Sequence, residues 1–127
     1  MPLPTMHRIS GKHLLVDFFG VKKEKLRDRK QLMRVLCEAL KKGGFRIIRK
    51  TGSYQFEGGG QGVTGFVLLA QSHAAFHSYP EWGYIALDIY SCGGYDPEPI
   101  ARAMEKHLDP QKVRRIFQKR GGKLVES

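Results

Sequence analysis

The sequence has few cysteines and no long hydrophobic run. No apolar stretch approaches the about 20 residues that a membrane-spanning helix needs, and the amino-terminal residues contain no apolar segment of the signal-peptide type. The two cysteines, Cys37 and Cys92, are too few for a disulfide framework, which favours a reducing, cytoplasmic location. With 41% hydrophobic and 27% charged residues the chain is unlike a disordered protein, so we expect one globular domain over residues 1–127.

Lysine and arginine are absent from the middle of a basic protein. The net charge is +10, yet residues 51–101 contain five acidic residues and no basic ones, so the basic excess lies in residues 1–50 and 102–127. A charge of this size suggests a nucleic acid or an anionic membrane as a partner. The basic segments lack interleaved aromatics that would stack on bases, so no specific nucleic-acid or membrane partner is predicted. The acidic middle segment favours a small cation instead.

Apolar patterns predict strands that are separated by two helices. Strands are expected at residues 13–19, 45–50, 63–71, 74–79, 84–92 and 112–119. The segment 63–71 is apolar almost throughout, which predicts that both of its faces are covered. One helix should follow the N-cap Asp28, and a second should begin at Asp96-Pro97. The glycine pair at 121–122 predicts a mobile tail.

This order of elements predicts an α+β fold with an antiparallel sheet and helices on one face, which makes a two-layer sandwich per protomer. The other face of the sheet would carry Tyr84, Asp88, Tyr90 and Cys92. This surface is too aromatic to be freely solvated. We therefore expect a two-fold homodimer with four layers in the order αββα.

Candidate chemistry is concentrated in residues 62–93, which contain Ser72, His73, His77 and Cys92. Two histidines and a cysteine are zinc-ligand types, but no fourth ligand is evident. A cysteine–histidine hydrolase is a second reading, which needs Cys92 at an electropositive place such as the start of the helix after Asp96. Residue types alone leave these alternatives open.

Several short motifs in this region carry a family resemblance. They are Gly-Lys-His-Leu-Leu-Val-Asp-Phe (11–18), Gly-Val-Thr-Gly (62–65), Gln-Ser-His (71–73), His-Ser-Tyr-Pro-Glu (77–81), Gly-Tyr-Ile-Ala-Leu-Asp (83–88) and Ser-Cys-Gly (91–93). In this order the motifs resemble the small prokaryotic, pyruvoyl-dependent S-adenosylmethionine decarboxylase proenzymes. The resemblance covers about residues 11–110, and the ordered set is more specific than any single motif.

The resemblance implies that the chain cuts itself between Gln71 and Ser72, which gives a beta chain of residues 1–71 and an alpha chain of residues 72–127. Ser72 would become a covalently bound pyruvoyl group, which forms a Schiff base with the substrate and acts as an electron sink. By the same resemblance His77 is the proton acceptor in processing, and Thr64 stands where the family has a serine that supports it. Cys92 would donate the proton to the decarboxylated product. No metal is expected.

The implied substrate is S-adenosylmethionine, and the product would supply the aminopropyl group for spermidine synthesis. Phe56 is the candidate to stack on adenine, and Tyr79 and Glu81 are further candidate substrate-binding residues. The sequence departs from the family at Gln71, where glutamate is usual, at Tyr79, where tryptophan is usual, and in a longer glycine loop after Phe56. These departures leave arginine or ornithine decarboxylation on the same fold as an alternative. An inactive homologue with a basic binding or regulatory role is a second alternative.

The spacing of the candidate residues adds an expectation about assembly. At about 3.3 Å per residue, Thr64 and Ser72 on one strand would lie roughly 26 Å apart. They cannot share a site within one protomer unless the strand breaks. A two-fold dimer would instead let Thr64 and His77 of one chain meet Ser72 and Cys92 of the other, which predicts composite active sites.

Overall fold

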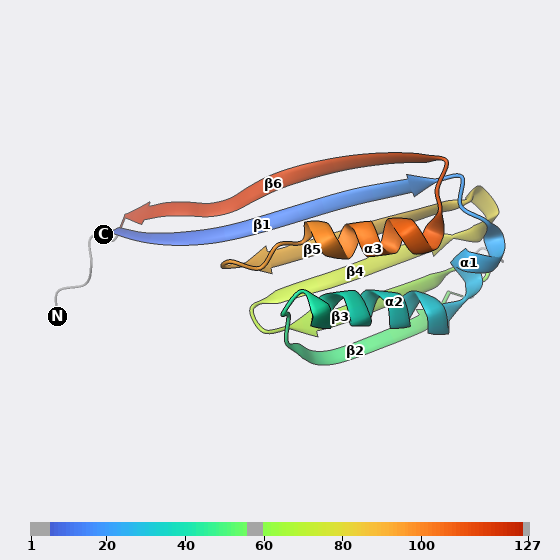
Figure 1. Cartoon of the computed structure of the whole chain (residues 1–127), viewed down its shortest axis with the longest axis horizontal. Helices are drawn as coiled ribbons and strands as arrows, with labels where there is room; N and C mark the ends of the chain where they lie inside the picture. The colour runs from blue at the N-terminus through green and yellow to red at the C-terminus, as the bar shows by residue number, and fades with distance from the viewer. Residues whose placement is uncertain (1–5, 56–59, 126–127) are drawn as a thin grey trace.

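The computed structural model describes residues 6–55 and 60–125, which fold into one antiparallel sheet and its covering helices. The elements are β1 (Met6–Phe19), α1 (Lys23–Arg27), α2 (Arg29–Lys42), β2 (Ile47–Tyr54), β3 (Val63–Leu69), β4 (Ser72–Tyr79), the 3-10 helix η1 (Pro80–Trp82), β5 (Tyr84–Cys92), α3 (Glu98–Leu108) and β6 (Lys112–Val125). The strand order is β2-β3-β4-β5-β1-β6, and α2 and α3 lie on the same face (Figure 1). The predicted α+β fold is confirmed. Within the described ranges, no helix is long and apolar enough to cross a membrane.

Helix α2 begins and ends at the residues that its sequence signals predict. The backbone N–H of Gln31 donates to the Asp28 carboxylate at 3.1 Å, so Asp28 is the N-cap. The helix ends at Gly43, and the following Gly44 has a φ of 86°, a left-handed conformation that suits glycine. The apolar side chains of Leu32, Leu36, Cys37 and Leu40 face the sheet and are buried.

Helix α3 starts two residues after Asp96, and Pro97 takes the N-cap position. The Asp96 side chain still acts at this end, because its Oδ1 accepts a hydrogen bond from the Glu98 N–H at 3.0 Å. Ile100, Met104 and Leu108 form the buried stripe. The difference from the expected start is within the usual uncertainty of helix ends.

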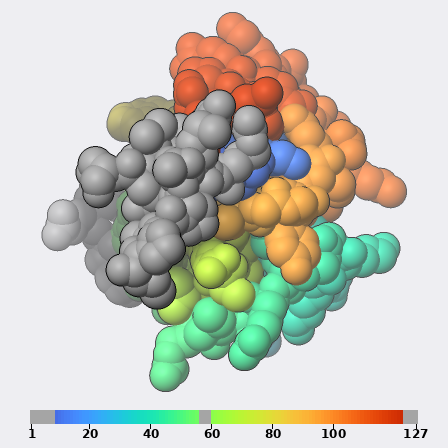
Figure 2. Space-filling model, turned by 90° about the vertical axis from the view of Figure 1, so that its left-hand side faces the viewer, coloured from blue at the N-terminus to red at the C-terminus, as the bar shows by residue number. Residues whose placement is uncertain are grey.

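The hydrophobic core lies between the sheet and the two long helices, which the space-filling view shows together on one side of the molecule (Figure 2). Strand β3 alternates strictly: Val63, Val67 and Leu69 are buried, whereas Phe66 and Leu68 are each 40% exposed on the opposite face. The expectation that both faces of this segment are covered is therefore wrong for one chain, because both helices pack on the same side. We call the face without helices the open face.

Two predicted boundaries are also wrong. The segment 63–71 is not one strand, because the chain turns at Ala70 and Gln71 and Leu69 lies opposite Ser72. The residues from Gly121 to Val125 are not a loose tail but the end of β6. They pair with the extension of β1, where Met6 lies opposite Val125, and this two-stranded arm projects beyond the rest of the sheet (Figure 1).

Candidate active site

Ser72 lies at the start of β4, immediately after the two-residue turn. It is 6% exposed, and its Oγ accepts a hydrogen bond from the backbone N–H of Cys92 at 3.0 Å. The preceding residue, Gln71, has a φ of 58°. A left-handed conformation costs a residue with a Cβ roughly 1–2 kcal/mol. The Gln71–Ser72 peptide bond thus follows a strained residue, and the adjacent hydroxyl is held by a backbone donor.

Thr64 and His77 form a second pair on the open face. They lie directly opposite each other on β3 and β4, and Thr64 Oγ1 is 2.9 Å from His77 Nδ1. Gln55, just beyond the end of β2, joins them, since its Nε2 donates to Thr64 Oγ1 and lies 3.5 Å from His77 Nδ1. Sequence reasoning missed Gln55. No sequence signal points to it, because its place depends on the β2–β3 register, in which Tyr54 is opposite Val63.

Gln55, Thr64 and His77 can form a hydrogen-bonded network that leaves one proton donor and one proton acceptor available. A hydroxyl offers one proton and two lone pairs. In the tautomer with the proton on Nδ1, His77 donates to Thr64 Oγ1 across the 2.9 Å contact and keeps Nε2 as an acceptor. With Gln55 also donating to this oxygen, both lone pairs of Thr64 are occupied. The Thr64 proton is then free to be donated to another group on the open face.

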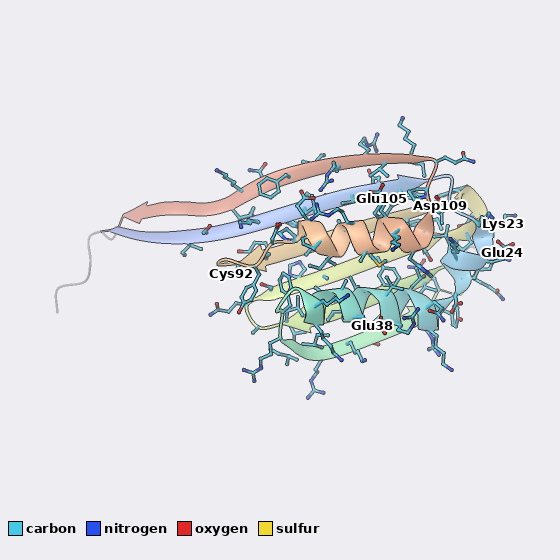
Figure 3. All side chains as sticks on the ribbon, in the orientation of Figure 1. Lys23, Glu24, Glu38, Cys92, Glu105 and Asp109 are labelled. Carbon is cyan, nitrogen blue, oxygen red and sulfur yellow. The ribbon has the colours of Figure 1, made fainter. Side chains whose placement is uncertain are left out.

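The two pairs do not meet within one chain. Ser72 and His77 are five residues apart on β4, which corresponds to about 17 Å along the strand. The odd spacing also places their side chains on opposite faces. The expected distance for Thr64 and Ser72 on one strand is therefore wrong, because they lie on two strands of a hairpin. That hairpin pairs Thr64 with His77, while Ser72 stays near Cys92 at the far end of β5 (Figure 3).

A hollow of about 410 Å³ lies at the Thr64–His77 end of the sheet. Its lining residues are Gln55, Gly60, Gly62, Ser78, Tyr79, Glu81 and Trp82. The rings of Tyr79 and Trp82 stack with centroids 5.7 Å apart, and Trp82 is 73% exposed. The backbone at Gly60 lies against the Glu81 carboxylate, which would have to move if position 60 carried a Cβ. Aromatic faces beside a carboxylate suit a cation with a flat ring. Phe56 lies outside the described residues.

The candidate zinc ligands His73, His77 and Cys92 are not brought together by the fold. His73 stacks instead on Tyr90, with ring centroids 5.6 Å apart. A different group, His13 with His73 and Asp88, has one potential ligand atom from each residue within 4.8 Å of the others.

Hydrogen bonds already engage the His13 ring of this group. Arg120 donates to His13 Nδ1 at 3.1 Å, which places the ring proton on Nε2, 2.5 Å from the Asp88 carboxylate. The neighbouring guanidinium also repels a metal cation. We interpret Arg120, His13 and Asp88 as a hydrogen-bonded chain across the open face and not as a metal site.

Tyr84 and Asp17 form a further polar contact on this face. The Tyr84 hydroxyl donates to Asp17 Oδ1 at 2.6 Å, and Arg114 pairs with the other carboxylate oxygen at 3.1 Å. Burial of the phenol, followed by this hydrogen bond and the Asp17 charge, raises the pKa of Tyr84 to about 12. The phenol therefore stays neutral and remains a hydrogen-bond donor at physiological pH.

Comparisons with known proteins identify the family of the chain. The sequence profile described as S-adenosylmethionine decarboxylase matches residues 12–121. The S-adenosylmethionine decarboxylase proenzyme of Methanococcus vannielii is 37% identical over 113 residues, which are 87% of this chain and 89% of the relative. That of Aquifex aeolicus is 35% identical over 119 residues, which are 91% and 84% of the two chains.

A solved structure shows that the fold is shared as well. The crystal structure of the adenosylmethionine decarboxylase from Aquifex aeolicus superposes with a TM-score of 0.74 at 34% identity. The match covers 94% of this chain and 96% of that one. With a sequence profile that spans most of the residues and relatives above 30% identity over nearly their full length, the chain belongs to the S-adenosylmethionine decarboxylase family.

Proposed function

We propose that the protein is a self-processing, pyruvoyl-dependent decarboxylase of S-adenosylmethionine. The relatives from Methanococcus vannielii and Aquifex aeolicus are both described as proenzymes, which fits a chain that matures by cleavage. The observation that carries the proposal is the placement of Ser72. Its hydroxyl is held by the Cys92 N–H, and the peptide bond before it follows the left-handed Gln71.

Processing would start with attack of Ser72 Oγ on the carbonyl carbon of Gln71. The C–N bond breaks and an ester forms. A base then removes the Cα proton of residue 72, and the Gln71 carboxylate leaves. Water replaces the nitrogen of the remaining enamine, which is released as ammonia and leaves a ketone at residue 72. We assign the base to His77 and the supporting hydroxyl to Thr64, because their hydrogen bond leaves Nε2 as an acceptor and a hydroxyl proton free.

The separation of the two pairs supports a homodimer with composite sites. The open face carries the partly exposed side chains of Leu15, Phe66, Leu68 and Ile116. A two-fold axis between two such faces that runs across the strands exchanges the strand ends. Thr64 and His77 of one protomer then lie over the Ser72 end of its partner. Cleavage frees residue 72 from Gln71 and so allows the new terminus to turn toward the open face.

The hollow beside Thr64 and His77 is the proposed substrate site. S-adenosylmethionine carries a sulfonium charge and an adenine ring, which suit the Glu81 carboxylate and the aromatic wall of Tyr79 and Trp82. Phe56 is a further candidate for stacking. The pyruvoyl group would supply an electrophilic carbonyl for the electron pair that departing CO₂ leaves. Cys92, next to residue 72, would then donate the proton that completes the product, an aminopropyl donor for spermidine synthesis.

Mass spectrometry of the purified protein tests processing directly. We expect two fragments, residues 1–71 and 72–127, with a pyruvoyl group blocking the second one. Ser72→Ala should stay as one chain. The matched variant Ser10→Ala, at an exposed position on β1, should be cleaved normally. An intact wild-type chain after long incubation would instead support the reading as an inactive homologue.

Two further measurements test the identity of the substrate and the assembly of the active site independently. Release of labelled CO₂ from S-adenosylmethionine, arginine and ornithine identifies the substrate, and release only from arginine or ornithine would contradict our proposal. Mixing refolded Ser72→Ala and His77→Ala chains tests the composite site. Cleavage of the His77→Ala chain in heterodimers is expected, because it keeps Ser72 and receives His77 from its partner. Absence of such rescue would count against shared sites.

A further inference from the structure

A second groove lies on the opposite side of the sheet from the open face, between helix α2 and the edge strand β2. Its volume is about 470 Å³. The lining residues are Arg29, Lys30, Met33, Arg34, Cys37, Glu38, Lys41, Lys50, Thr51 and Gly52. None of them belongs to the Ser72–Cys92 or Thr64–His77 pairs or to the hollow beside Glu81. Figure 3 labels Glu38 on α2, the helix that forms one wall.

The rim of this groove is strongly basic. Five of its residues carry positive charge, whereas Glu38 is the one acid in the lining. Glu38 is already paired with Arg34, whose guanidinium lies 3.1 Å from the carboxylate. Within the part of the chain that the structure describes, no carboxylate lies within ion-pair distance of Lys30, Lys41 or Lys50. Three ammonium groups thus border the groove without a partner there.

The floor of the groove is apolar and closely packed. Cys37 is 4% exposed, and Met33 lies against Gly52, where an added Cβ would be 2.7 Å from Met33 Cγ. Burial raises the pKa of the Cys37 thiol, while Lys50 and Lys41 oppose this rise. Both of these lysines line the groove, and they come from different elements. Lys41 belongs to α2 and Lys50 to β2.

The position of Arg29 completes the groove at the start of α2. Its guanidinium lies 5.2 Å from the centroid of the Tyr54 ring and donates to the Gly52 carbonyl at 3.4 Å. These contacts fix the arginine between helix and strand. It is therefore oriented toward the groove before any ligand binds, which lowers the entropic cost of binding.

We propose that this groove binds a small organic polyanion that carries a flat ring, of the nucleoside triphosphate class. The charges of Lys30, Lys41 and Lys50 match the phosphates. The half-buried Met33 in the floor can contact the face of a ring, a contact that inorganic phosphate alone cannot make. A volume of about 470 Å³ suits a small molecule, since ligand pockets span roughly 300–1,000 Å³. The site assigns a role to basic residues that the decarboxylase chemistry does not use.

Calorimetric titration of the full chain with uridine triphosphate tests the proposal, because this probe lacks the adenosine that the active site is expected to recognise. We expect saturable one-to-one binding. The double variant Lys41→Gln/Lys50→Gln should weaken it by about tenfold or more, since hydrogen bonds to charged groups are lost. The matched double variant Lys23→Gln/Lys106→Gln, which removes the same charge from exposed positions on α1 and α3, should change affinity less than about twofold.

Two further ligands test the contributions of the basic rim and of the apolar floor to binding. Tripolyphosphate should bind more weakly than uridine triphosphate, and uridine should not bind measurably. Equal weakening by both double variants would show nonspecific attraction and overturn the proposal, as would absence of binding. Tripolyphosphate as tight as uridine triphosphate would overturn the role of the floor. The readout is binding alone, so failure of the proposed decarboxylation would leave this result unchanged.

Discussion

A threonine stands at position 64, where the proenzymes that the sequence resembles carry a serine. The structure keeps its hydroxyl 2.9 Å from His77 Nδ1 and adds Gln55 as a second donor to the same oxygen. A β-branched side chain on a strand has restricted rotamers, so the methyl group helps to hold the hydroxyl in one direction. The replacement therefore preserves the hydrogen-bonded pair, and Gln55 becomes part of it.

We expect Gln55→Leu to slow self-cleavage about fivefold, because loss of one hydrogen bond of about 1 kcal/mol misplaces the Thr64 hydroxyl. Gel densitometry of fragment formation over time measures this rate. Gln111→Leu, an exposed change just before β6, is the control. Gln55 is a positioning residue that acts through Thr64. The double variant Gln55→Leu/Thr64→Val should therefore be no slower than Thr64→Val, and fully additive effects would contradict this role.

The Tyr84 hydroxyl gives a prediction about alkaline pH. The folded pKa is about 12 and the usual value is 10.0, so the fold favours the neutral phenol. Its contribution to stability is complete below pH 10 and is lost as the pH rises toward 12. Ultraviolet absorbance of the phenolate should show a late titration step that Tyr84→Phe removes. Tyr95→Phe should retain this step, and its loss there would refute the assignment.

The elements differ in how locally their ends are determined. Helix α2 is bounded by Asp28 and Gly43, which act on the backbone of the same helix, and both ends could be predicted. The strand at 63–69 ends at a turn of Ala70 and Gln71, which carries no glycine, proline or asparagine signal. The hairpin is formed because β4 pairs with β3 from Leu69 and Ser72 onward. Pairing between consecutive strands overrides the local turn preference there.

Removal of the N-cap of α2 should destabilise the protein. We expect Asp28→Ala to lower the free energy of unfolding by about 1 kcal/mol, because the Gln31 N–H loses its acceptor. Urea unfolding followed by circular dichroism measures the difference. Asp28→Ser, which keeps an acceptor oxygen, should restore most of the stability. If alanine and serine were equally destabilising, the loss would come from some other contact of Asp28.

At the scale of the whole molecule, the open face of the sheet leaves apolar side chains exposed, and contacts within a single chain do not account for this exposure. Both long helices pack on one side, so Phe66 and Leu68 stay 40% exposed beside the polar chain of Arg120, His13 and Asp88. A second copy that packs on this face would bury the apolar side chains. The same contact would bring the two separated residue pairs together.

Introduction of charge on the open face should therefore affect assembly and processing together. We expect Phe66→Lys/Leu68→Lys to give monomers in analytical ultracentrifugation, because buried lysines are strongly disfavoured in an interface. Self-cleavage should fall in parallel, since the composite site is lost. Phe117→Lys, at an exposed position on the helix side of β6, should remain dimeric and be cleaved. A monomeric double variant that is still cleaved would exclude sites shared between protomers.

The local sequence was sufficient for the two long helices and for the clean alternation of 84–92, because caps and apolar stripes are properties of neighbouring residues. The ordered motifs, through the family that they resemble, named Ser72, His77, Cys92 and Thr64 as candidate site residues, and their roles stay predictions. The tertiary structure decided which of these residues meet. Strand register joins Thr64 to His77 and Gln55, whereas Ser72 joins Cys92, because backbone hydrogen bonds between distant segments set these contacts. It also placed Lys41 and Lys50, which come from different elements, at one groove. The net charge of the sequence could not show this clustering of positive side chains.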